Sequence, residues 1–109
     1  MTPLRGDVWI VDLGLAAKVR PGLVVSVPAS DSERALVTVV PYTTSPRGTR
    51  FEVASGVPFL HAGMFDAQNL GSIPHARLVR HIGRLLPARL VPVEDEVARW
   101  LGLELRKIA

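Results

Sequence analysis

Arg, Thr, Ser, His and carboxylate groups are the side chains that this sequence offers for chemistry, because it contains no cysteine. The histidines His61, His75 and His81 show no i,i+4 pair with a nearby carboxylate, so we expect no metal site and no cofactor. Asp7 and Asp12 lie five residues apart in one predicted strand. Their side chains would point to opposite faces, so they cannot form a catalytic carboxylate pair. Any hydrolytic chemistry must therefore use these groups without a metal ion.

Arg20 and Thr43 are the two positions whose surroundings favour a functional role. Arg20 ends a loop directly before an apolar segment, and Thr43 begins a polar loop directly after one. Pro21 disfavours the helical conformation for the residue before it and so helps to fix the backbone of Arg20. Functional residues concentrate in loops, whereas strands mostly supply packing. Taken separately, an arginine in the setting of Arg20 is most often a surface charge, and a threonine in the setting of Thr43 is most often a turn residue.

Short apolar runs separated by Gly, Pro, Ser and Asp predict a small antiparallel barrel or sandwich around these positions. We expect strands over residues 7–13, 22–27, 35–40, 50–53, 63–70 and 79–85, with one helical turn over 74–78. Residues 14–21 are predicted to be a loop. Pro41 predicts an edge or a bend where the third of these strands ends.

The one convincing helix is C-terminal. Pro92 suits its first position, where the missing N–H costs nothing. The acidic segment 94–96 would complement the positive end of the helix dipole, and Arg106 and Lys107 the negative end. Gly102 predicts an end near Leu103. Five apolar residues fall on one helical face that we expect to cover the sheet: Val93, Val97, Trp100, Leu101 and Ile108.

Length and composition indicate a single globular domain over residues 1–109. Hydrophobic residues make up 48% of the chain and charged residues 21%, which is not the composition of a disordered protein. No apolar run is long enough to span a membrane and no signal peptide is present, so a cytoplasmic protein is expected. Eleven of the thirteen basic residues are Arg, and many lie in the acid-free stretch between Asp66 and Glu94. This segregation favours a polyanionic partner, although charge runs are usually solvated faces.

Several short motifs occur together in a characteristic order. They are Arg5-Gly6-Asp7-Val8-Trp9, Asp12-Leu13, Arg20-Pro21-Gly22-Leu23-Val24-Val25-Ser26, Val40-Pro41-Tyr42-Thr43-Thr44, Phe51-Glu52-Val53, Asp66-Ala67-Gln68 and Leu101-Gly102-Leu103. In this order and spacing they resemble the MazF/PemK family of toxin endoribonucleases. The resemblance extends over nearly the whole chain, from Arg5 to Leu103.

The resemblance implies an SH3-like barrel with a C-terminal helix, and a homodimer that cleaves single-stranded RNA and is neutralised by a small antitoxin. The catalytic Arg and Thr of the family fall on Arg20 and Thr43. The implied reaction is attack by a ribose 2′-OH on the adjacent phosphate, which yields a 2′,3′-cyclic phosphate and a 5′-OH. Further residues expected to bind the substrate are Lys18, Thr44, Ser45, Arg47 and Gln68.

The first loop differs from the family pattern. Residues 13–19 are shorter and more apolar than the corresponding stretch of most members. Leu15, Ala16 and Val19 could therefore form an exposed apolar patch for a protein partner. Two alternatives to a nuclease remain open on the sequence: a non-catalytic module that binds a protein such as DNA gyrase, and a module that binds RNA without cutting it.

Overall fold

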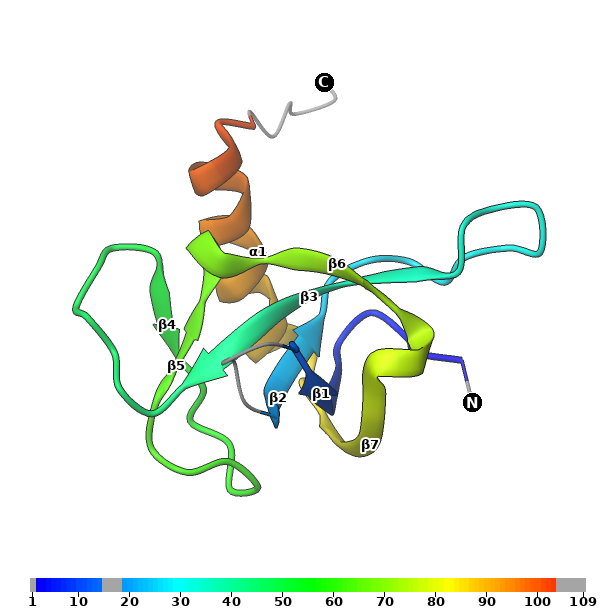
Figure 1. Ribbon diagram of the computed structural model, residues 1–109. Coiled ribbons are helices and arrows are strands. Elements are labelled where there is room, and N and C mark those ends of the chain that lie inside the picture. The colour runs from blue at the N-terminus through cyan, green and yellow to red at the C-terminus, as the bar shows by residue number, and fades with distance from the viewer. Residues whose placement is uncertain (1, 15–18, 104–109) are drawn as a thin grey trace.

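The computed structural model describes residues 2–14 and 19–103 (Figure 1). The described residues form seven strands, two short 3-10 helices and one α-helix. In chain order they are β1 (Asp7–Asp12), β2 (Val19–Val24), β3 (Leu36–Thr43), β4 (Glu52–Ala54), β5 (Met64–Asp66), η1 (Ala67–Asn69), β6 (Gly71–Pro74), η2 (His75–Arg77), β7 (Leu78–Arg84) and α1 (Pro87–Leu101). The predicted fold class, mainly β with a C-terminal helix, is confirmed.

All strand pairs in the described sheet are antiparallel, and its order is β4-β5-β3-β2-β1-β7, with β6 also paired to β3. The long β3 connects the two parts of this sheet (Figure 1). Pro41 pairs with Gly22 of β2, and the next residue, Tyr42, already pairs with Phe65 of β5. β2 and β5 lie on opposite edges of β3. On the edge that faces β5, the partner changes from β6, opposite Leu36 to Val39, to β5, opposite Tyr42 and Thr43. Pro41 lies between these two partners, inside the strand, because β3 runs on to Thr43.

The apolar runs are explained by burial on both faces of the sheet. One cluster, which the helix covers, contains Val8, Leu23, Val40, Tyr42, Phe65, Leu85, Leu90 and Val93. The other cluster contains Trp9, Val11, Val24, Val37 and Val39. Successive residues of one strand, such as Val8 and Trp9, thus enter opposite clusters, as the pleat requires. Trp9 and Phe51 are both buried.

The helix begins earlier than the sequence predicts. Pro87, not Pro92, occupies its first turn, and Pro92 lies inside the helix. The early start is favoured because it brings Leu90 into the apolar cluster beside Val93. The acidic residues consequently lie beyond the first turn: Glu94 pairs with Arg5 and Glu96 with Arg99, so they do not stabilise the helix N-terminus.

The C-terminal end of α1 is close to the prediction. Gly102, in the left-handed conformation, ends the helix after Leu101 and donates its N–H to carbonyls of the last turn. Val93 is buried and Val97 packs against the core, whereas Trp100 and Leu101 are about half exposed. Ile108, Arg106 and Lys107 lie outside the described residues.

The predicted loop over residues 14–21 is partly wrong, because β2 already begins at Val19 and includes Arg20 and Pro21. Pairing with β1 explains this extension: Val19, Arg20 and Pro21 lie opposite Asp12, Val11 and Ile10. Leu15, Ala16 and Lys18 lie outside the described residues. Among the described helices, none has the length and apolarity needed to cross a membrane.

Candidate active site

A pocket of about 520 Å³ opens where β2 begins and β3 ends. We call it the main pocket. Its polar lining residues are Arg20, Thr43, Thr44, Ser45, His61 and Arg80. Its apolar lining residues include Ile10, Val19, Pro21, Phe59, Leu60 and Ile82. The guanidinium groups of two arginines and the hydroxyl groups of two threonines and a serine thus meet in this pocket, and no carboxylate of the described residues lines it, which suits an anionic ligand.

Arg20 and Thr43 come together because β2 and β3 are antiparallel neighbours. Their paired residues run from Val24 opposite Val39 to Gly22 opposite Pro41. Continued for two residues beyond the last of these pairs, the same register would bring Arg20 level with Thr43, and both residues line the main pocket. Residues that are level in an antiparallel pair share a face of the sheet. The two predicted catalytic residues therefore line one pocket at the same end of the β2–β3 pair, and Arg20 is half-buried.

Contacts with Ser45, Met64 and Gly63 fix the position of Thr43. Its Oγ1 accepts a hydrogen bond of 3.0 Å from the backbone N–H of Ser45, which leaves the hydroxyl proton available for a ligand. Thr43 also pairs with Met64 of β5. Beside this pair, Gly63 packs so closely that a Cβ there would lie 2.3 Å from the carbonyl oxygen of Thr43. Glycine is thus needed at position 63 to place Thr43.

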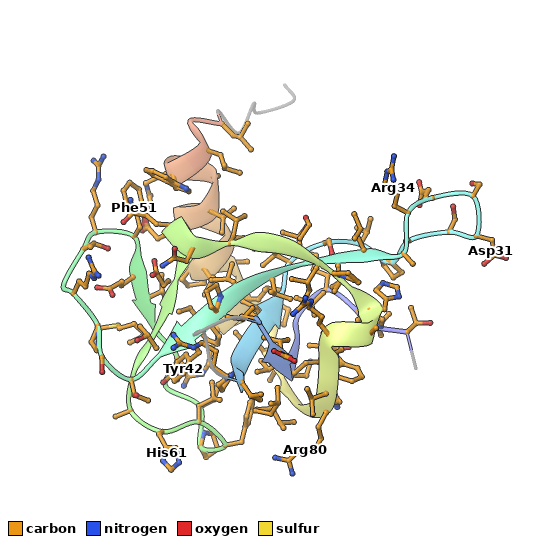
Figure 2. The ribbon with its side chains drawn as sticks, viewed as in Figure 1. Asp31, Arg34, Tyr42, Phe51, His61 and Arg80 are labelled. Carbon is orange, nitrogen blue, oxygen red and sulfur yellow. The ribbon has the colours of Figure 1, made fainter. Side chains whose placement is uncertain are left out.

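Tyr42 connects the end of β3 to the segment 55–63. The ring is buried, and the hydroxyl donates a 2.5 Å hydrogen bond to the backbone carbonyl of His61. Ser55 Oγ lies 3.2 Å from the same hydroxyl. Figure 2 shows Tyr42 inside the fold and His61 at its surface. The tyrosine thereby fixes the part of the main pocket that His61 and its neighbours line.

Arg47 and Gln68, predicted as substrate ligands, do not line the main pocket. They lie together in a second pocket of about 360 Å³, which Trp100 of α1 also lines. The loop between β3 and β4 joins the two pockets, because its Thr44 and Ser45 line the first and its Arg47 the second. The structure thus separates the predicted ligands into two groups.

Glu52 organises this loop. Its carboxylate accepts hydrogen bonds from the backbone N–H groups of Arg47, Gly48 and Thr49, at 2.9, 2.6 and 2.8 Å. The hydrogen bond from Arg47 contributes most to holding the pKa of Glu52 below its ordinary value, and the other two act in the same direction. Glu52 therefore shapes the segment that connects the two pockets.

Most of the arginines between Asp66 and Glu94 have a structural role. Arg84 donates to Asp7 at 2.9 Å, Arg77 lies 4.0 Å from Asp12, and Arg89 donates to a backbone carbonyl. The expectation of a charged face for a polyanion is thus too broad. Within this stretch, Arg80 differs because it lines the main pocket.

His61 and Arg80 are two pocket residues that the sequence did not single out as substrate ligands. His61 was weighed only as a metal ligand, and the described residues contain no cluster of three or more side chains that could hold a metal ion. Arg80 was one Arg among several in a charged stretch. Alternation along the strand over 79–85 could have placed Arg80 and Ile82 on one face, but not in one pocket with Arg20. Lys18, also predicted, lies outside the described residues.

Comparison with known proteins gives consistent matches over the whole domain. Residues 4–101 match the family described as "PemK-like, MazF-like toxin of type II toxin-antitoxin system". The relative named Endoribonuclease MazF4 from Mycobacterium tuberculosis is 35% identical over 101 residues, which cover 93% of this chain and 94% of the relative.

Solved structures are similar as well. A mycobacterial endoribonuclease in complex with its cognate antitoxin is 32% identical, with a TM-score of 0.80 over 95% of this chain and 99% of that one. The Mycobacterium tuberculosis toxin MazF-mt6 is 28% identical, with a TM-score of 0.76 over 90% of this chain and 98% of that one.

Proposed function

The chain belongs to the PemK-like, MazF-like toxin family of type II toxin–antitoxin systems, and on this premise we propose that it is an endoribonuclease that cuts single-stranded RNA without a metal ion. The observation that supports the proposal most directly is the convergence of Arg20 and Thr43 in one pocket, which none of the acidic residues in the described part of the chain lines. The name of the mycobacterial relative, an endoribonuclease, points the same way.

The reaction is an in-line displacement at phosphorus. The ribose 2′-oxygen bonds to the adjacent phosphorus, the bond from phosphorus to the 5′-oxygen breaks, and the products are a 2′,3′-cyclic phosphate and a 5′-OH. Arg20 would grip two phosphate oxygens and stabilise the charge that develops on them. Thr43 would donate its hydroxyl proton to the phosphate or accept from the 2′-OH, and so hold the nucleophile in line.

The proton balance needs a group that accepts the 2′-OH proton and one that supplies a proton to the 5′-oxygen. A permanently charged guanidinium is a poor acceptor, so Arg20 acts by electrostatic stabilisation or as an acid. His61 is the imidazole among the residues that line the main pocket. A neutral imidazole nitrogen can accept a proton, which makes His61 our candidate for the acceptor.

The other residues predicted to bind the substrate have roles in the same proposal. We propose that Thr44 and Ser45 help to hold the scissile nucleotide, and that Lys18, Arg47 and Gln68 contact nucleotides further along the strand. The active form would be a homodimer in the cytoplasm, neutralised by a cognate antitoxin. The mycobacterial relative solved in complex with its antitoxin supports the last of these statements.

The test is cleavage of long RNA in excess EDTA, followed by mapping of the cut sites and analysis of the new ends. We expect defined cuts with 2′,3′-cyclic phosphate and 5′-OH ends. Arg20→Ala and Thr43→Ala should each lower kcat by about 100-fold or more, whereas Thr43→Ser should retain activity because it keeps the hydroxyl. Arg34→Ala is the matched control, since it removes the same charge from an exposed position outside the main pocket.

Two outcomes would contradict the proposal. Intact RNA after incubation with folded protein would exclude a nuclease of this kind and favour a module that binds RNA or protein. Cleavage that Arg20→Ala and Thr43→Ala leave unchanged would show that the cutting occurs elsewhere.

A further inference from the structure

Arg80 lies on a face of the sheet that the proposed catalytic pair does not share. Ile10 of β1 pairs with Pro21 on one side and with Arg80 of β7 on the other. Residues that are level across strands share a face, so Pro21, Ile10 and Arg80 form one row, and all three line the main pocket. Arg20 directly precedes Pro21, and the pleat assigns it to the opposite face. The main pocket therefore has two parts, which meet where β2 begins.

The charge of Arg80 is available to a ligand. Its neighbour in sequence, His81, lies 3.4 Å from Asp7, and Arg84 donates to the same carboxylate. For Arg80, by contrast, no hydrogen bond or ion pair is found within the described part of the chain, and its side chain projects from the surface in Figure 2. The Arg80 side chain is exposed, so a ligand phosphate could bind its guanidinium without breaking an existing ion pair.

Phe59 adds an aromatic surface beside Arg80. A Cβ on Gly83 would lie only 2.5–2.7 Å from three atoms of the Phe59 ring, so the ring rests on the backbone of β7 at this glycine. The other side of the ring is partly open, because 38% of Phe59 is exposed. Ile82, between Gly83 and His81, lines the same pocket. An aromatic ring supported from below and open above is a surface on which a nucleobase can stack.

From this arrangement we infer that Arg80 and Phe59 form a subsite for the nucleotide next to the scissile one, in which Phe59 stacks on its base and Arg80 binds its phosphate. The inference rests on the proposed function, since it assumes that RNA passes over the Arg20–Thr43 part of the pocket. It adds a second anchoring point that involves no proton transfer. Arg80 and Phe59 should therefore affect substrate affinity more than the chemical step.

Binding of single-stranded DNA tests the subsite separately from cleavage. The probe is the deoxy version of an RNA that the protein cuts, or a mixed-sequence oligonucleotide if it cuts none. DNA lacks the 2′-OH nucleophile, so it binds without reacting. For single strands, each phosphate contact contributes about 0.7 to the slope of log affinity against log salt concentration. We expect Arg80→Ala to reduce that slope by about 0.7 and to weaken binding by about 5- to 10-fold at low salt.

The variants separate charge from stacking. Arg80→Lys should restore most of the slope, and Phe59→Leu should weaken binding by about 5-fold or more with the slope unchanged. Arg34→Ala controls for net charge, and circular dichroism checks that each variant is folded. In RNA cleavage, Arg80→Ala should raise KM by a larger factor than it lowers kcat.

The experiments can refute the nuclease activity and the Arg80–Phe59 subsite separately. If RNA is cut but Arg80→Ala alters the salt slope and KM no more than Arg34→Ala does, the subsite is wrong and the nuclease stands. If no RNA is cut but DNA binds with the expected effects of Arg80→Ala and Phe59→Leu, the subsite stands as a binding site and the nuclease is wrong. If Phe59→Leu leaves affinity unchanged while Arg80→Ala weakens it, the stacking part is refuted.

Discussion

Replacing Gly63 by alanine should disturb the active site, although Gly63 itself is not among the residues proposed to bind RNA. Gly63 precedes β5 and packs against the end of β3. A methyl group there would lie 2.3 Å from the carbonyl oxygen of Thr43 and 2.9 Å from the nearest atom of the Tyr42 ring. Ordinary contacts of this kind begin at 3.4 Å. Either the backbone at Thr43 or the start of β5 must therefore move.

The size of the movement follows from these distances. Relief of the contact with the carbonyl oxygen needs 3.4 − 2.3, or about 1.1 Å. A misplacement of about 1 Å of a catalytic group costs about 100-fold in rate. The strain should also lower the free energy of unfolding by about 1–3 kcal/mol, as for other overpacked sites. The oxygen in question is backbone, so no change of side-chain rotamer can avoid the clash.

The assay is RNA cleavage in EDTA, with thermal unfolding measured on the same samples. Gly71→Ala is the control, because it is also a glycine-to-alanine change at a strand end, with no atom within 4 Å of the added Cβ. We expect Gly63→Ala to be folded at low temperature with kcat reduced by about 100-fold, and Gly71→Ala to cut like the parent protein. A Gly63→Ala protein with normal kcat would refute the placement of Thr43 by this contact.

Three further changes test the framework around the site. Tyr42→Phe removes the hydrogen bond to the His61 carbonyl. It should lower the free energy of unfolding by about 1 kcal/mol in a denaturant titration and slow RNA cleavage. Asp7→Ala leaves Arg84 without its buried partner and should cost about 2 kcal/mol on the same measurement. Glu52 has a lowered pKa, so its stabilisation of the loop is complete above the ordinary value of 4.5 and is lost as the pH falls through the folded-state pKa. The loop should therefore loosen in acid, seen as faster amide exchange, and Glu52→Gln should remove that pH dependence.

The fold was largely predictable because its signals are local. Apolar runs such as residues 7–13 predict a strand buried on both faces, and β1 is such a strand. The start of the helix could not be predicted in the same way. Both Pro87 and Pro92 suit the first turn of a helix, and only packing against the sheet distinguishes them. Leu90 gains burial when the helix starts at Pro87. That gain depends on the sheet beneath it, which local sequence does not describe.

The register of β2 against β3 decides whether Arg20 and Thr43 can act together. The local sequence pattern of the two strands does not determine that register. The connection between these strands covers residues 25–35, which is too long for a turn type to fix the register. A slip by one residue would move Thr43 to the other face of the sheet relative to Arg20. Here the resemblance to the family supplied what physical pattern could not, and the pairing of Gly22 with Pro41 gives its structural basis.

The basic residues of β7 have two different roles: His81 and Arg84 hold the strand in place, and Arg80 lines the main pocket. Arg84 and His81 both contact Asp7, which is buried at the start of β1, and they thereby lock β7 to the sheet. Arg80 directly precedes His81, so it lines the pocket from a strand that these contacts hold rigid. A guanidinium on a rigid strand loses less entropy when it binds a phosphate than one on a mobile loop. If Arg80 binds RNA as inferred, Asp7→Ala should weaken RNA binding by releasing β7, in addition to destabilising the fold.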